Sequence, residues 1–466
     1  MSADNKLKQL NTIKSDISST RAYKLLNLLF DEGSFTELDA LVKHDQGYAE
    51  VISGFGLINS CPIYAFAQNY DMDGGAVSRS HLVKIKKLYE LAVRTGLPII
   101  GIYNSIGARI NEGAEMLSSY GDLLMKCNNA SGVIPQISVV LGSCVGTNAM
   151  LASSANVIIM TKDAELGIST IGENTSAEFA EKNGLAHIIA DDEKIALEKT
   201  RDIVTALPPN NLSSAVLTQF GEMSYDDTMP KNAVKILSEN ESKAIVLDII
   251  NSCFDFGSFI EIKGGYGQAF CTGLARLEGR SVGVILSNRN HDEGVADADS
   301  CEKASQFIRL CDAFSIPIIT FVDTKRFSSL RASVRLSNSY AEATAPKVTI
   351  IVGDAFGASY IALGGKGSNS DATFAWPTAA ISALEPQTAV AMLWQDRLKG
   401  SENPIEDRKK LIREYREIEA SVIKSAELGN IDDIIEPQET RNKLIFSLNV
   451  LSGKRISRLP KKHSII

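Results

Sequence analysis

Short runs of apolar residues recur along the chain, and they predict buried β-strands. The runs in the first half cover residues 98–104, 136–142 and 156–161, and those in the second half cover residues 281–287, 317–323 and 347–353. Between the runs, apolar residues follow the spacing of one helix face. This spacing is found at Leu82, Ile85, Leu88, Tyr89 and Ala92, and again at Ala304, Phe307, Ile308 and Cys311. The alternation of strands and helices predicts a layered α/β fold.

The pattern of the first half returns in the second half. FDEGSFTELD at residues 30–39 matches FDFGSFIEIK at residues 254–263. Two apolar strands around a glycine-marked turn follow in each half, at residues 54–69 and 272–288. Because a fixed order of matches is hard to obtain by chance, we interpret the chain as an internal repeat.

Proline and glycine spacings give the clearest evidence for the repeat. Pro135, Gly142 and Gly146 are spaced by seven and four residues, and so are Pro346, Gly353 and Gly357. The segment at residues 207–240 carries turn and linker residues, which places the boundary between the copies there. We therefore predict two domains, residues 1–225 and 226–466.

Composition narrows the class of protein. The chain has 466 residues, of which 44% are hydrophobic and 22% charged, and its net charge is −8. These values predict a soluble globular protein, and the negative charge argues against nucleic acid as a partner. No stretch of about 18 apolar residues predicts a membrane span, and the N-terminus lacks the apolar core of a signal peptide. We interpret the basic run near the C-terminus as a solvated tail or the rim of a subunit contact: Lys454, Arg455, Arg458, Lys461 and Lys462.

Cysteine and histidine usage gives little support for metal or nucleophile chemistry. The seven cysteines are scattered without a CxxC pair, which predicts a reducing cytoplasm and no zinc ribbon or disulfide framework. The five histidines stand alone in the sequence, so we expect structural or surface roles for them. Cys144 lies beside the repeated glycines, and a buried structural thiol is the better interpretation of it. The motifs GxGxxG after a strand, P-loop, HExxH and GxSxG are also missing.

In each copy, a strand ends at glycines and a stretch of small residues begins, at residues 139–155 and 350–365. A helix starting there would point free backbone N–H groups outward, and these could hold a developing oxyanion. Small residues at this place also permit tight helix–strand packing, and the pattern alone leaves both interpretations open. A second loop, residues 105–113, should lie beside the first copy's glycines at the carboxyl edge of the sheet. Two converging amides would form an oxyanion hole, which suits enolate chemistry on a thioester.

The motifs resemble those of one known family. GARINEG at residues 107–113 and ASGVIPQIS at 130–138 are similar to the N-terminal half of carboxyltransferase (β) subunits of biotin-dependent acyl-CoA carboxylases. Further segments resemble the second half and the end of the propionyl-CoA carboxylase β and methylmalonyl-CoA decarboxylase α type: residues 303–323, 339–349, 374–382, 427–444 and 452–463.

The resemblance implies two tandem crotonase-like (ClpP/crotonase superfamily) domains in a hexamer, with one oxyanion hole in each domain. The first hole would hold the acyl-CoA thioester, through the amides of Gly107, Gly146 and Thr147. The second would hold the ureido oxygen of biotin, through Gly357 and Ala358. The neighbouring cofactor-binding positions would be Ala108, Arg109, Arg326 and Phe327. Biotin would arrive on a separate carrier protein, with a biotin carboxylase or decarboxylase subunit as a further partner, and no metal is implied.

Several positions depart from the family pattern. Cys-Ala-Gly-Gly-Ala reads Cys144-Val145-Gly146-Thr147-Asn148 in this chain, and Val-Asp-Val-Pro-Gly-Phe reads Val322-Asp323-Thr324-Lys325-Arg326-Phe327, with a shortened loop after it. Two alternatives to a carboxyltransferase follow from these departures. One is a catalytically impaired paralogue that assembles with an active subunit, and the other is a biotin-independent crotonase-like enzyme acting on acyl-CoA.

Overall fold

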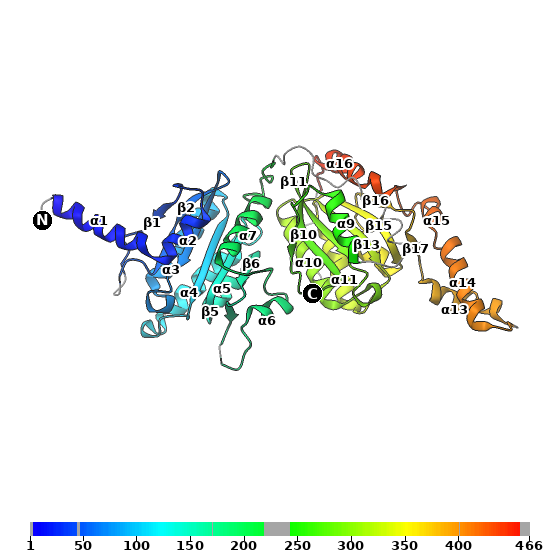
Figure 1. Cartoon of the computed structure of the whole chain (residues 1–466), viewed down its shortest axis with the longest axis horizontal. Helices are drawn as coiled ribbons and strands as arrows, with labels where there is room; N and C mark the ends of the chain where they lie inside the picture. Colours follow the sequence, from blue (N-terminus) through cyan, green and yellow to red (C-terminus); the bar gives the residue numbers. More distant parts are fainter. Residues whose placement is uncertain (1–2, 44–46, 170, 219–242, 400, 457–466) are drawn as a thin grey trace. The chain divides into compact units, whose positions relative to one another are not determined.

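The computed structural model describes residues 3–43, 47–169, 171–218, 243–399 and 401–456. The chain divides into two compact α/β units, residues 1–216 and 217–466, each built on one large sheet (Figure 1). The predicted boundary between residues 225 and 226 lies outside the described residues, so it stays a prediction.

The first sheet has the strand order β1-β2-β3-β4-β5-β6-β8, and β7 pairs with β5. Its strands are β1 (Thr36–Leu38), β2 (Val51–Ile58), β3 (Cys61–Gln68), β4 (Ile99–Ser105), β5 (Gln136–Val145), β6 (Val157–Thr161), β7 (Glu165–Gly167) and β8 (Ile188–Ala190). The helices of this unit are α1 (Ala3–Ser19), α2 (Arg21–Leu29), α3 (Arg79–Thr95), α4 (Glu115–Ala130), α5 (Thr147–Ser153), α6 (Ala177–Lys182) and α7 (Glu193–Ala206), with 3₁₀ turns η1 (Asp73–Gly75) and η2 (Ile110–Glu112).

The second sheet repeats the first, strand for strand, in the order β9-β10-β11-β13-β15-β16-β18, and β17 pairs with β15. Its strands are β9 (Ile260–Ile262), β10 (Phe270–Leu277), β11 (Arg280–Ser287), β13 (Ile318–Thr324), β15 (Lys347–Phe356), β16 (Ala372–Ala375), β17 (Ala380–Ser382) and β18 (Asp433–Ile434), and a separate pair is formed by β12 (Val295–Ala296) and β14 (Arg326–Phe327). The helices are α9 (Lys243–Cys253), α10 (Ala298–Ala313), α11 (Leu330–Glu342), α12 (Ala358–Ala362), α13 (Pro386–Leu393), α14 (Pro404–Ile418), α15 (Val422–Glu427) and α16 (Thr440–Leu451), with η3 (Asp292–Gly294), η4 (Gln395–Leu398) and η5 (Pro437–Glu439).

The predicted strands and helices are therefore confirmed, and the repeat extends to local detail. The register between β4 and β5 shifts between Tyr103 and Ser105, and the register between β13 and β15 shifts at the equivalent place. Helix α3 begins at a cap in which Ser78 accepts the N–H of His81, and α10 begins where Asp297 accepts the N–H of Ser300. No helix within the described ranges is long and apolar enough to cross a membrane.

One detail of the predicted hairpins is wrong. The turn between β10 and β11 contains Gly279 as expected, next to Glu278. The turn between β2 and β3 contains no glycine, because Asn59 and Ser60 occupy its centre with φ of 49° and 66°. Two positive φ values match the right-handed twist of a two-residue hairpin, and asparagine tolerates that conformation better than most residues.

Both faces of each sheet are covered. In the first unit, Tyr64 and Phe66 of β3 pack with side chains of α3 and α4 in one core cluster. Ile63 and Ala65 point to the opposite face and are fully buried as well, where α2 and α7 contact the strands. Burial on two faces explains why the strands read as continuous apolar runs rather than as alternating ones.

The repeated glycines Gly142 and Gly353 have a packing role. A Cβ atom at Gly142 would lie 2.5 Å from Oδ1 of Asn104, and one at Gly353 would lie 2.3 Å from Oδ1 of Asp323. In each sheet, the side chain from the neighbouring strand rests directly on the glycine. The spacing found in the sequence thus reflects a close contact between adjacent parallel strands.

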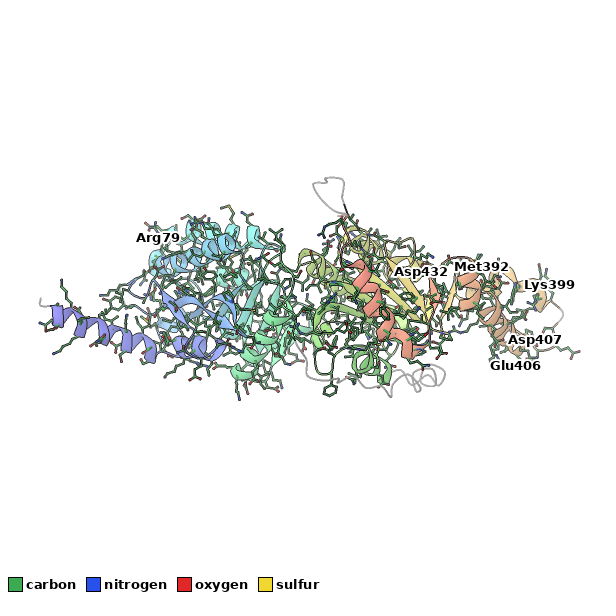
Figure 2. All side chains as sticks on the ribbon, turned by 90° about the horizontal axis from the view of Figure 1, so that it is seen from above. Arg79, Met392, Lys399, Glu406, Asp407 and Asp432 are labelled. Carbon is green, nitrogen blue, oxygen red and sulfur yellow. The ribbon has the colours of Figure 1, made fainter. Side chains whose placement is uncertain are left out.

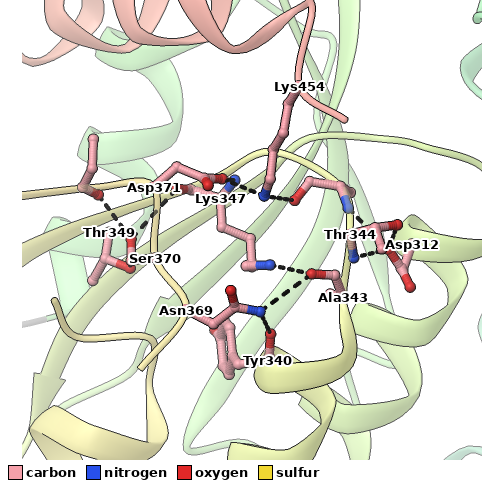
Figure 3. Close-up of polar contacts among 12 residues, drawn as sticks. Asp312, Tyr340, Ala343, Thr344, Lys347, Thr349, Asn369, Ser370, Asp371 and Lys454 are labelled. Carbon is pink, nitrogen blue, oxygen red and sulfur yellow. Dashed lines mark hydrogen bonds and ion pairs between the residues drawn. The ribbon is translucent and has the colours of Figure 1, made fainter. Parts of the chain in front are cut away.

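A buried polar cluster closes the other end of β15 (Figure 3). Asp312 Oδ1 accepts the N–H of Ala345 at 2.9 Å, and Lys347 Nζ donates to the carbonyl of Ala343. Lys454 Nζ donates to Asp371 Oδ2 at 2.7 Å, and its side chain is 9% exposed. Lys454 is therefore not part of a solvated tail as we expected. Arg455 is exposed, and Arg458, Lys461 and Lys462 lie outside the described residues.

We predict that Gly353→Ala destabilises the second unit by about 2 kcal/mol, because the new methyl group meets a carboxylate that is itself held in place. Gly121→Ala is the matched control. Gly121 lies in the middle of α4 with open space around it, so alanine should stabilise the first unit by about 0.5–1 kcal/mol. Thermal unfolding of both variants checks the prediction, and an unchanged melting temperature for Gly353→Ala would contradict it.

Candidate functional site

Each sheet has the same strand-to-helix junction. Strand β5 ends at Val145, Gly146 follows with φ 67° and ψ −144°, and α5 begins at the next residue. Strand β15 ends at Phe356, Gly357 follows with φ 46° and ψ −110°, and α12 begins. Positive φ with a strongly negative ψ is open almost only to glycine, so the residue type follows from the turn.

The N–H groups of both junction glycines already have acceptors. Gly146 N lies 3.1 Å from the carbonyl of Gly167 and 3.2 Å from that of Ile168, and Gly357 N lies 2.9 Å from the carbonyl of Ser382. The next amide in each copy belongs to the first helical residue, which has no acceptor within its own helix. Within each predicted donor pair, the N–H of the glycine is therefore bonded within the turn. The N–H of Thr147 or Ala358 is not used in that way.

The loop after β4 lies beside the first junction, as expected. A Cβ atom at Gly107 would lie 3.7 Å from the carbonyl oxygen of Val145. Gly107 has φ 110°, and its N–H donates to Ser105 Oγ at 3.1 Å. Its carbonyl accepts the N–H of Val77 at 2.8 Å, which holds the loop against the segment before α3. The structure thus brings Gly107 and Gly146 together at the carboxyl edge of the first sheet.

The equivalent loop of the second copy has a different backbone. Arg326 stands 219 positions after Gly107 and lies in the extended strand β14, paired with Val295 of β12. The Arg326 side chain is exposed, and Phe327 is half-buried. The first copy has a parallel bridge at the same place, between Val77 and Ala108, so the two loops differ mainly in that the positive φ of Gly107 has no counterpart at Arg326.

Arg109, expected at the cofactor, is engaged in a buried ion pair. Its guanidinium lies 2.6 Å from Glu50 Oε1 and 3.0 Å from Asp73 Oδ2, and its side chain is only 11% exposed. Ser78 Oγ donates to the other oxygen of Glu50 at 2.5 Å. Arg109 thus ties the Gly107 loop to the start of β2 and to η1, while Ala108 is exposed. Sequence reasoning did not find Glu50, although an acid directly before a strand that begins with buried residues is a signal for a paired charge.

The second edge carries a charged cluster that sequence reasoning also missed. Asp354 is 1% exposed, and its two oxygens lie 3.3 Å from Arg289 and 2.6 Å from Arg416. Arg289 also contacts Asp323 at 3.2 Å. Burial raises the pKa of Asp323, and the charge of Arg289 opposes that shift. Because these residues come from the loop after β11, from β13, from β15 and from α14, no local sequence pattern joins them.

Neither Cys144 nor His81 is suited to nucleophilic or acid–base chemistry. Cys144 is fully buried, and burial raises the pKa of its thiol well above the ordinary range, which confirms the structural interpretation. His81 is 1% exposed, and burial lowers its pKa to about 3, with Lys84 and Arg109 adding to the shift. Its ring is therefore neutral near pH 7.

Comparisons with known proteins agree with this geometry. The family model described as the carboxyl transferase domain matches residues 20–466. The chain is 33% identical to the methylmalonyl-CoA decarboxylase subunit alpha of Propionigenium modestum, over 96% of this chain and 92% of that protein. It is also 33% identical to the mitochondrial propionyl-CoA carboxylase beta chain of Homo sapiens, over 96% and 88%. A crystal structure of transcarboxylase 12S with methylmalonyl-coenzyme A and methylmalonic acid bound matches with a TM-score of 0.92 and 29% identity, over 99% of this chain and 98% of that one.

These matches confirm the predicted crotonase-like fold and the resemblance to carboxyltransferase subunits. They do not favour the two alternatives, an impaired paralogue or a biotin-independent enzyme.

We predict that Arg109→Leu lowers the stability of the first unit by about 3–5 kcal/mol, because it leaves the buried Glu50 carboxylate without its partner. The control is Arg79→Ala, which removes a 3.7 Å ion pair with Glu115 on the surface (Figure 2). Both of those side chains are more than half exposed, so the loss should stay below about 1 kcal/mol. Thermal unfolding of the two variants measures the difference, and equal losses would contradict a stabilising role for the buried pair.

We also predict an acid-dependent loss of stability from His81. Its folded pKa of about 3 lies below the ordinary value of 6.5, so below pH 6.5 the unfolded chain binds a proton that the folded chain does not. Stability is then lost as the pH falls from about 6.5 toward 3, by up to about 1.4 kcal/mol per pH unit. Because carboxylates such as Asp31 also contribute an acid-dependent loss, the test is the difference: wild type should lose more stability than His81→Gln across this range, and His291→Gln is the control. Parallel pH profiles for His81→Gln and wild type would refute this origin.

Proposed function

This chain belongs to the carboxyl transferase family, and we propose that it moves a carboxyl group between biotin on a separate carrier protein and a short-chain acyl-CoA. The acyl group that we propose is of the propionyl-CoA or methylmalonyl-CoA type. Relatives that match across almost the whole chain support it, because they are a methylmalonyl-CoA decarboxylase subunit and a propionyl-CoA carboxylase chain. Those names cover both carboxylation and decarboxylation, so the proposal includes both directions.

The observation that carries this proposal is the pair of equivalent junctions, each of which leaves one backbone amide for a ligand. We assign the first to the thioester. The amide of Thr147 would donate to the thioester oxygen of the acyl-CoA, and the amide of Gly107, which donates to Ser105 Oγ in this structure, would exchange that acceptor for the same oxygen when the substrate binds. When the bond between the α-carbon and the carboxyl group breaks, the electron pair moves onto that oxygen. Backbone donors held at the carboxyl edge of the sheet stabilise the charge that develops there.

We assign the second junction to biotin. A ureido oxygen accepts hydrogen bonds, and the amide of Ala358 is a donor of the kind that it requires, so the residues present fit the group. When bound, biotin supplies the ureido group that carries the carboxyl between proteins. Gly357 shapes the turn, since its N–H is already donated to Ser382. Arg326 and Phe327 frame this edge in place of the glycine loop of the first copy.

We further propose that the chain forms a hexamer and docks a biotin carrier protein, in a complex with a biotin carboxylase or decarboxylase subunit in the cytoplasm. The hexamer assembly of transcarboxylase 12S, the structure that matches this chain, supports the first part. The lack of a biotinylation motif in this chain supports a separate carrier.

A proline substitution tests the thioester assignment sharply. Thr147→Pro removes one N–H at the first position of α5, where proline is tolerated in helices. Transfer of radiolabel from carboxyl-labelled methylmalonyl-CoA to a biotinylated carrier should slow by about 10²–10³-fold. Thr147→Ala keeps the N–H and should stay within a few-fold of wild type.

Two outcomes would contradict the proposal at different levels. A native rate for Thr147→Pro would overturn the assignment of that amide, while a wild-type protein that transfers no label from any short acyl-CoA would overturn the function. Ala358→Pro gives the parallel test on the carrier side.

A further inference from the structure

Two buried amide side chains face each other behind the first junction. Gln68 is the last residue of β3 and Asn148 is the second residue of α5, and they are 3% and 1% exposed. Gln68 Nε2 donates to Asn148 Oδ1 at 3.1 Å, and Asn148 Nδ2 donates back to Gln68 Oε1 at 3.1 Å. The pair therefore links the end of a sheet strand to the first turn of the helix that carries Thr147.

Gln68 also reaches the loop that carries Gly107. Its Oε1 accepts the backbone N–H of Asn104 at 3.2 Å, and Asn104 is three residues before Gly107. One side chain thus connects three segments, the ends of β3 and β4 and the start of α5. The two amides assigned to the thioester, Gly107 and Thr147, lie on the two segments that Gln68 holds together.

The network fixes its own orientation. Gln68 Oε1 accepts two N–H groups, so turning the amide over would bring its NH₂ group against two other donors. On the other side, Gln68 Nε2 lies 3.4 Å from Nε2 of His81, whose neutral ring offers an acceptor there. Asn148 Nδ2 makes a further contact of 3.6 Å with Cys144 Sγ. Among the described residues Nδ1 of His81 has no partner, but the Gln68 and Asn148 amides are satisfied, and a satisfied buried amide pair is rigid.

The pair is not a requirement of the fold. The second unit repeats the same strands and junction, yet it has Ser287 and Ser359 at the equivalent positions, and Asp323 replaces Asn104. The family pattern has alanine where this chain has Asn148. The amide pair therefore belongs to the first edge of this chain, where a departure from the family brings a new contact with it.

We propose that Gln68 and Asn148 are positioning residues that set the separation between the amides of Gly107 and Thr147. This inference rests on the proposed function of that edge. It explains how the chain keeps a defined donor geometry although the second glycine of the family pattern has become Thr147. Thr147 is bulkier than glycine, and the residue after it, Asn148, anchors the first turn of α5 through its side chain.

The test uses the full chain with three variants: Gln68→Met, Asn148→Ala and the double variant. Each single variant leaves a buried amide without its partner, so stability falls together with activity. The double variant leaves an apolar pair and should regain part of the lost melting temperature, while the backbone N–H of Asn104 still lacks the acceptor that Gln68 supplied. We expect kcat for label transfer from methylmalonyl-CoA to fall by about tenfold to a hundredfold in the double variant, while KM for the carrier stays unchanged, because small displacements of catalytic donors are costly.

Gln136→Met is the matched control. Gln136 is buried at the opposite end of β5, where its Nε2 donates to the carbonyl of Cys127 at 3.0 Å. This variant should lose stability and keep the wild-type kcat. A double variant that melts like wild type and also turns over like wild type would overturn the positioning role.

Hydrogen–deuterium exchange separates this inference from the proposed function. Peptides covering residues 104–110 and 146–150 should both exchange faster in the double variant and stay unchanged in Gln136→Met. This readout does not depend on turnover. If wild type transfers no label, the proposed function fails, but the exchange measurement still tests the positioning role. Unchanged exchange in both peptides of the double variant would refute that role.

Discussion

The turn at the end of the longest strand in each sheet is the constraint on which the site depends. At Gly146 and Gly357 the chain passes from strand to helix with a positive φ, and the N–H of each glycine is donated sideways to the end of a short strand, β7 or β17. This bond decides the direction of the helix and therefore which amide faces outward. A residue with a Cβ atom would strain that backbone, and at Gly357 its Cβ would also lie 2.7 Å from the carbonyl of Ala383.

Around this shared turn the two copies have diverged in their polar residues. The first edge uses neutral amides, Gln68, Asn104 and Asn148, with the ion pair of Arg109 and Glu50 next to them. The second edge uses charges, with Asp354 held between Arg289 and Arg416. Buried charges require partners from several elements, whereas amides satisfy one another in pairs. The sequence indicated a difference between the copies at Arg326. The structure shows that the copies also differ in the polar residues packed near each junction.

The sequence predicted the elements and the repeat well, because continuous apolar runs and spaced glycines are local signals. Gly142 and Gly353 could be found by spacing alone, since each is required by one neighbouring side chain. The site was predicted only in outline. Spacing was enough to find Gly146 and Gly357. It could not show that their N–H groups are already donated, because the acceptors lie at the ends of β7 and β17, which the sequence does not mark. Arg109 was placed at a ligand for the same reason, because its partner Glu50 lies 59 residues away and nothing local joins them.

The short strands β7 and β17 have a consequence for how such a protein can change over evolution. Each has to supply little more than a carbonyl group at the junction, so the chain that follows it is free to vary in length. After β7 a loop leads to α6, whereas after β17 the chain continues into α13 and α14. The two copies thus carry different segments directly after the same junction, while the strand-to-helix turn itself is alike in both. Insertions at this point offer a route to new regulation or new partners that leaves the inherited chemistry intact.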